Sequence, residues 1–202
     1  MLQSLLTEIH ALGALDWIIT ATALIYVYLA ARENPWCWAW GGISCVLWAY
    51  VSFTQYELWL DALLQVYYVG MSVYGLYRWK FGAALAKAAT LPITEWPIKK
   101  HAALWLLGIP LSLLFGYGFA EYTPAAATYL DAFTTVFAIL TTYLVVQKVR
   151  SNWLYWIGID VALLYLYASR GAYLFATLMV VYIAIAAWGW WRWRVPVTTT
   201  LA

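Results

Sequence analysis

The chain has 202 residues, of which 66% are hydrophobic, 19% are aromatic and only 10% are charged. Soluble domains carry far more charge, so this composition excludes that class and indicates a polytopic membrane protein. The net charge of +2 gives no reason to expect a nucleic-acid partner.

Seven apolar segments of near-spanning length follow one another, separated by charged residues, proline or glycine. Because a membrane-spanning helix needs roughly 20 mostly apolar residues, they predict transmembrane helices at residues 14–31, 36–54, 59–77, 102–119, 129–147, 152–168 and 172–191. Short connections make successive helices antiparallel neighbours, and residues 80–101 predict a surface linker between two halves. The N-terminus lacks a basic region, so no cleavable signal peptide is expected.

Lysine and arginine residues sort to one side of this predicted bundle. Alternate connections face opposite sides of the bilayer, and of the 11 basic residues only Arg170 falls on the side that holds most of the acidic ones. Cytoplasmic loops are enriched in Lys and Arg. We therefore expect the N-terminus outside and the C-terminus inside.

Internal similarity predicts a repeat. Three patterns occur in both parts of the chain: Arg32–Asn34 and Arg150–Asn152, Tyr74–Trp79 and Trp188–Trp193, and Asp16 and Asp131. The first of these aligns Trp38 with Trp156. A single helix between two three-helix repeats restores their parallel orientation, as in SWEET transporters. The expected fold is all-α with a 3+1+3 arrangement: a first repeat at 1–79, a cytoplasmic linker plus connecting helix at 80–128, and a second repeat at 129–202.

The stretch Asn152–Asp160 is the strongest candidate for a binding site. At 3.6 residues per turn, Trp153, Trp156 and Asp160 share one helical face, and Asp160 lies near mid-membrane. A carboxylate in an apolar segment normally faces a bundle interior or a wet cavity, and two indole faces beside it suit a flat cation. The alternative is that Trp153 belongs to an interfacial aromatic belt and Asp160 pairs with another helix.

The third predicted helix adds polar side chains at similar depth. Its Gln65 is placed either to bond a ligand or to bond a neighbouring helix, whereas the threonines of the fifth helix more often bond their own backbone. The candidate substrate-binding residues are Gln65, Tyr68, Ser72, Asn152, Trp153, Trp156 and Asp160.

The sequence shows no comparable grouping of residues for catalysis or metal binding. The two histidines lie at helix ends or in loops, far from the cysteines, so we expect no enzyme, no metal site and no cofactor. A retinal protein needs a buried Schiff-base lysine, and every lysine here lies in or beside a loop.

The resemblance to a known family rests on the motif Asn152-Trp153-x-x-Trp156-x-x-x-Asp160, the pattern Leu64–Val66 and the helix end at Tyr74-Gly75. Together they resemble the PnuC family of bacterial vitamin transporters, over nearly the whole chain. The resemblance implies a SWEET-like fold in the bacterial cytoplasmic membrane and facilitated diffusion of an unphosphorylated vitamin, which a cytoplasmic kinase then traps.

The resemblance also bears on the substrate. Nicotinamide riboside is the usual substrate of the family, and similar members carry thiamine or riboflavin. Familiar nicotinamide riboside carriers have Asn where this chain has Asp160, and a carboxylate also accepts from an aminopyrimidine, which favours thiamine. Nicotinamide riboside is the first alternative and a sugar, as in SWEET proteins, a more distant one. The expected partners are the vitamin, the lipid bilayer and the kinase, and a homo-oligomer is left open.

Overall fold

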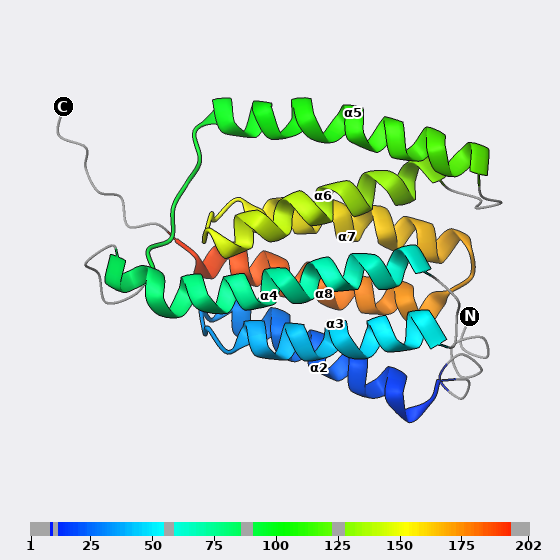
Figure 1. The fold of residues 1–202 in the computed structure, drawn as a ribbon, viewed down its shortest axis with the longest axis horizontal. Coiled ribbons are helices and arrows are strands. Elements are labelled where there is room, and N and C mark those ends of the chain that lie inside the picture. The colour runs from blue at the N-terminus through cyan, green and yellow to red at the C-terminus, as the bar shows by residue number, and fades with distance from the viewer. Residues whose placement is uncertain (1–8, 10–11, 55–58, 86–90, 123–127, 195–202) are drawn as a thin grey trace.

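The computed structural model describes residues 9, 12–54, 59–85, 91–122 and 128–194. These residues form seven α-helices (Figure 1): α2 (Ala14–Ala31), α3 (Cys37–Thr54), α4 (Trp59–Leu85), α5 (Ile98–Tyr122), α6 (Thr128–Val146), α7 (Asn152–Ser169) and α8 (Tyr173–Arg192). All seven predicted helices are present. The main differences are that α4 continues past residue 77 and that α5 begins before residue 102, so the connection between them is shorter than predicted.

Four of the described helices are long and apolar enough to cross a membrane, namely α2, α5, α6 and α8. Large apolar side chains point outward from the bundle, such as Leu106, which is 76% exposed. A contiguous apolar surface of this kind is unfavourable in water and is suited to lipid. The other three helices, α3, α4 and α7, contribute many of the polar side chains of the interior.

The helices pack in two groups of three. Helix α3 packs between α2 and α4, α7 packs between α6 and α8, and the groups meet where α2 contacts α8 and where α4 contacts α6. Helix α5 packs mainly against α6 at the edge of the bundle (Figure 1). We call residues 12–85 the first half and residues 128–194 the second half.

Charge separates the two ends of the bundle. The α2–α3 turn, the α6–α7 turn, the ends of α4 and α8 and the start of α5 lie at one end (Figure 1). We call it the basic end, because it carries Arg32, Arg78, Lys80, Lys99, Lys100, Lys148, Arg150, Arg192 and Arg194. The opposite end, which we call the acidic end, includes Asp16, Glu121 and Asp131 and the ion pair of Arg170 with Asp131 at 3.7 Å.

The turns at the basic end repeat the same backbone geometry in both halves. Glu33 and Lys148 each have a positive φ, of 58° and 51°. The amide that follows each of them donates to a carbonyl five residues earlier, at Leu29 and at Leu144. Residues other than glycine rarely adopt a positive φ. Because both turns have one at the same place, followed by the same hydrogen bond, we treat Glu33 and Lys148 as equivalent positions of the two halves.

Tryptophan packing follows the same register. In each half a tryptophan lies against a helix glycine and edge-on to a second tryptophan. In the first half Trp38 contacts Gly75 and Trp79, and the two indole rings have centroids 5.6 Å apart and planes at 88°. In the second half Trp153 contacts Gly189 and Trp193, with ring centroids 5.3 Å apart and planes at 85°. Trp38 therefore corresponds to Trp153. The predicted alignment of Trp38 with Trp156 is wrong by three residues, because the repeated feature is the turn and not the Arg-x-Asn pattern.

The connection before α5 has exposed residues and is also docked on the bundle by backbone hydrogen bonds. The Thr94 amide donates to the Lys148 carbonyl at 2.9 Å, and the Arg150 amide donates to the Thr94 carbonyl at 2.9 Å. Leu91 is buried in the same apolar cluster as Trp79 and Trp193. Residues 91–96 thus pack across the basic end, where hydrogen bonds tie them to the α6–α7 turn.

Candidate functional site

Two adjoining hollows lie between the halves, and we call them together the central cavity. Their volumes are about 440 Å³ and about 400 Å³. Both are lined by Tyr26 of α2, by Gln65 and Tyr68 of α4 and by Trp156 of α7. Helix α3 adds residues to the larger hollow, and α8 adds residues to the smaller one. The cavity is therefore built by both halves.

Asp160 is the charged group of the smaller hollow. Its side chain lines that space together with Trp153, Trp156 and Tyr182, and the residue is only 6% exposed. Within the described residues, no hydrogen bond or ion pair reaches its carboxylate. The alternative prediction is that Asp160 pairs with another helix, and no such pair is seen among the described residues. An unpaired carboxylate in a cavity is an attractive site for a cation.

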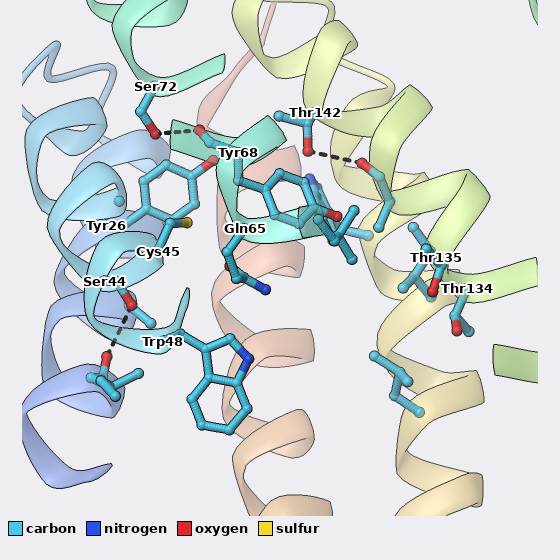
Figure 2. Close-up of a pocket in the computed structure, with 18 of the residues that line it drawn as sticks. Tyr26, Ser44, Cys45, Trp48, Gln65, Tyr68, Ser72, Thr134, Thr135 and Thr142 are labelled. Carbon is cyan, nitrogen blue, oxygen red and sulfur yellow. Dashed lines mark hydrogen bonds between the residues drawn. The ribbon is translucent and has the colours of Figure 1, made fainter. Parts of the chain in front are cut away.

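Gln65 lines both hollows, and Figure 2 shows its side chain extending into the larger one, which Trp48 and Tyr68 also line. Among the residues that the structure describes, its amide has no hydrogen-bond partner. An amide offers two donors and an acceptor. The alternative role of Gln65, as a link to a neighbouring helix, is therefore not seen in the described part of the chain.

Ser72, Thr134 and Thr142 line the larger hollow but use their hydroxyl protons locally. Ser72 donates to the Tyr68 carbonyl at 2.9 Å, Thr142 donates to Ala138 at 2.8 Å, and Thr134 bonds the carbonyls one turn before it. The prediction that threonines bond their own backbone is confirmed for these two and wrong for Thr141, whose buried hydroxyl has no hydrogen-bond partner among the described residues. Their oxygens keep acceptor capacity toward the cavity.

Trp153 and Asn152 are mainly parts of the scaffold. Trp153 lines the smaller hollow, but it is 2% exposed and packs edge-on against Trp193. It therefore does not belong to a lipid-facing aromatic belt. Asn152 is fully buried, lines neither hollow and donates from Nδ2 to the Val149 carbonyl at 2.7 Å. The structure does not bring it to the cavity.

Several lining residues were not predicted from the sequence: Tyr26, Trp38, Ser44, Cys45, Trp48 and Tyr182. Nothing in the local sequence separates an aromatic that faces a cavity from one that faces lipid. For Cys45 a signal existed. With Trp38 aligned to Trp153, Cys45 occupies in α3 the position that Asp160 occupies in α7, so the correct register would have found it.

The chemistry of the site is that of binding. Its lining joins one carboxylate, one amide, hydroxyl groups and aromatic rings. Among the described residues, no group of three His, Cys, Asp or Glu side chains could hold a metal ion. The arrangement can compensate a positive charge, stack on a flat ring and bond hydroxyl groups.

Comparison with known proteins places this chain among transporters. Residues 13–195 match the family model for the nicotinamide mononucleotide transporter. The nicotinamide riboside transporter PnuC of Escherichia coli (strain K12) is 25% identical over 205 aligned positions, which cover 89% of this chain and 85% of that protein. The PnuC of Neisseria mucosa is 24% identical over 191 positions, which cover 87% of this chain and 70% of that protein.

The fold is shared with a solved member. The crystal structure of the vitamin B3 transporter PnuC matches 95% of this chain and 87% of its own, with a TM-score of 0.71 at 19% identity. That likeness shows the fold. Together with the apolar helices, the match indicates a multi-pass membrane protein. Since the family model spans residues 13–195, this chain belongs to the nicotinamide mononucleotide transporter family, the PnuC family that its α7 motif resembles.

Proposed function

We propose that this protein carries nicotinamide riboside across the membrane through the central cavity. Relatives that match most of the chain are nicotinamide riboside transporters. The observation in this chain that carries the proposal is the Asp160 carboxylate, which is buried, faces the cavity and has no hydrogen-bond or ion-pair partner among the described residues. Nicotinamide riboside supplies the complement, because its pyridinium ring is flat and positively charged.

The remaining lining fits the rest of this substrate. Small-molecule sites are commonly cavities of roughly 300–1,000 Å³, and the smaller hollow alone measures about 400 Å³. Trp156 and Tyr182 offer aromatic faces near Asp160 for the cationic ring. Gln65, which lines both hollows, is placed to bond the ribose hydroxyl groups. The proposed binding residues are thus Gln65, Tyr68, Ser72, Trp156 and Asp160, whereas Trp153 supports the wall of the smaller hollow.

Thiamine is the second candidate, and one observation favours it. Asp160 replaces the Asn of familiar nicotinamide riboside carriers, and its carboxylate can accept hydrogen bonds from an aminopyrimidine as well as neutralise a thiazolium. On this ground the sequence alone favours thiamine. The named relatives favour nicotinamide riboside, which therefore becomes the main proposal. Neutral riboflavin or glucose would leave the carboxylate uncompensated.

A ligand screen on the purified protein tests the proposal. We expect nicotinamide riboside to bind saturably, measured by calorimetry and by quenching of tryptophan fluorescence. Nicotinamide, which lacks both the charge and the ribose, is the matched control and should bind weakly. Tighter binding of thiamine would move the assignment to the second candidate. Binding of riboflavin or glucose without either cation would overturn both.

The distribution of charge indicates how the protein is oriented in the membrane. Because Lys and Arg gather at the basic end, we propose that this end faces the cytoplasm of a bacterial inner membrane, with the N-terminus outside and the C-terminus inside. Transport is then downhill, and a cytoplasmic kinase retains the vitamin by phosphorylation. In cells, deleting that kinase should lower uptake while leaving binding by the purified protein unchanged.

We also propose that the two halves are parallel repeats in a 3+1+3 arrangement, with 1–79 and 129–202 as repeats and 80–128 as linker plus connecting helix. The equivalent turns and tryptophan contacts support it. A cavity between such repeats is where transporters of this plan place their substrate.

A further inference from the structure

Contacts between the two halves gather at the basic end. Trp79 of α4 donates from Nε1 to the Val146 carbonyl of α6 at 3.1 Å. Beside it, Arg78 donates to Gln147 at 3.0 Å, and Gln147 donates to the Tyr74 hydroxyl at 3.2 Å. These bonds hold the end of α4 against the end of α6.

Below the cavity, tryptophans close this end in two layers. Trp38 and Trp153 each line one hollow and form its floor on the side of the basic end. Trp79 of the first half and Trp193 of the second half lie next to them, and the centroids of their rings are 5.8 Å apart. All four rings are buried, so they pack between the cavity and the basic end.

An ion pair joins the halves beside these rings. Lys148 of the α6–α7 turn donates from Nζ to Glu33 of the α2–α3 turn at 3.1 Å. Lys148 is only 3% exposed and its Nζ also lies over the Trp79 ring at 4.7 Å. Glu33 and Lys148 are the two equivalent positive-φ residues, so the repeat brings opposite charges together where the halves meet.

The cavity extends the other way. Its lining on α3 reaches Trp48, and on α7 it reaches Tyr167, close to the C-terminal end of that helix. Both residues lie in the C-terminal halves of their helices, and α3 and α7 both end at the acidic end (Figure 1). The cavity therefore has a floor of tryptophans toward the basic end and lining residues that extend toward the acidic end.

We propose that Glu33 and Lys148 form a charge latch that keeps the central cavity shut at the basic end, and that the latch must open for the cavity to reach that side. The inference deepens the proposed function, because it names the residues that set which side the site faces. The geometry suits a reversible closure. When the halves separate, the Lys148 ammonium loses its contacts with the Glu33 carboxylate and the Trp79 ring and is hydrated instead. The Glu33 side chain is already partly exposed, so water can reach the ion pair from that side.

Cys45 is a native reporter for this closure. Its thiol lines the larger hollow, whereas the other cysteine, Cys37, is fully buried. A membrane-impermeant maleimide added on one side of proteoliposomes should react with Cys45 only when the cavity is open to that side. Lys99→Cys in a Cys45→Ser background marks the basic end, because Lys99 is exposed there, and calibrates the orientation of the protein.

We expect Cys45 of the unmodified protein to be labelled mainly from the acidic end. Glu33→Gln and Lys148→Gln should each raise labelling from the basic end about tenfold relative to the acidic end, the size of a typical coupling between two states. The charge-swapped protein, Glu33→Lys with Lys148→Glu, should return the ratio to within about twofold of the original. The matched control is Glu95→Gln, which removes the ion pair between Glu95 and Arg150 at 2.9 Å. This pair also lies at the basic end, but it does not join α2 to the α6–α7 turn.

The result is readable whatever the substrate is. Labelling needs no ligand, so failure of nicotinamide riboside to bind would leave this test intact. A ratio that stays unchanged in Glu33→Gln overturns the latch, as does an equal change in Glu95→Gln or a charge swap that restores nothing. Glu33 is partly exposed, so its variant keeps the test available where replacement of the buried lysine prevents folding.

Discussion

Burial of Asp160 costs free energy, because its carboxylate loses water inside a membrane bundle. Protein groups usually offset such a cost, and for Asp160 none of the described residues does so through a hydrogen bond or an ion pair. A bound cation would offset it. Affinity and stability should therefore respond in opposite ways to the loss of this charge.

The variant Asp160→Asn tests this relation. It keeps the shape of the side chain and removes the charge, so affinity for nicotinamide riboside should fall by roughly 1.5–3 kcal/mol, the range for hydrogen bonds to charged groups. The melting temperature without ligand should stay the same or rise. Calorimetry and thermal melting of one preparation measure both. A protein that melts early yet binds as tightly as the parent would show that Asp160 is a scaffold residue.

The two tryptophans of the motif should separate by the same measurements. Trp156 lines both hollows and is half-buried, so Trp156→Ala should weaken binding by about 1 kcal/mol or more. Trp153 is buried against Trp193, so Trp153→Ala should lower the free energy of unfolding by roughly 3–5 kcal/mol. Equal effects of the two variants on affinity and stability would contradict this division.

At the scale of helices, the contacts of Trp38 and Trp153 with the neighbouring helices each depend on a glycine. A Cβ at Gly189 would come within 2.6 Å of the Trp153 ring, and a Cβ at Gly75 would overlap the Trp38 ring. Both glycines let α8 and α4 approach the helix before them. Gly158 of α7, by contrast, has no atom within 4 Å of the position that a Cβ would take.

These contacts predict opposite effects of one substitution. Gly189→Ala should destabilise the protein by about 1–3 kcal/mol through overpacking, whereas Gly158→Ala should be neutral or stabilising by up to about 1 kcal/mol. Thermal melting in detergent gives the comparison. A loss of stability in Gly158→Ala as large as that in Gly189→Ala would show that the tryptophan contact is not the cause.

The helices were predictable because long apolar runs leave few alternatives in a chain of this composition. The polar members of the site were also visible, since Asp160 and Gln65 stand out in apolar segments. The register of the repeat was not, because it depends on the positive φ of Glu33 and Lys148, which no pattern of hydrophobicity encodes. Tyr26 and Tyr182 were missed for a similar reason: their role depends on which face of the helix turns inward.

At the scale of the whole molecule, the charges of the cavity limit how transport can be driven. Asp160 is the only Asp, Glu, Lys, Arg or His among the described residues that line the central cavity. Ion-coupled carriers use chains of such groups as relays. Under the proposed function Asp160 neutralises the cationic substrate, and the described lining then holds no second Asp, Glu, Lys, Arg or His for a coupling proton.

Transport in proteoliposomes should therefore be downhill. We expect labelled nicotinamide riboside to equilibrate across the membrane at the same final level with or without an imposed proton or sodium gradient. Unlabelled nicotinamide riboside trapped inside should accelerate exchange, because a carrier returns faster when loaded. The Asp160→Asn variant is the matched control and should slow both processes. Accumulation above the external concentration that depends on an ion gradient would contradict this mechanism, since it would require a coupling site outside the central cavity.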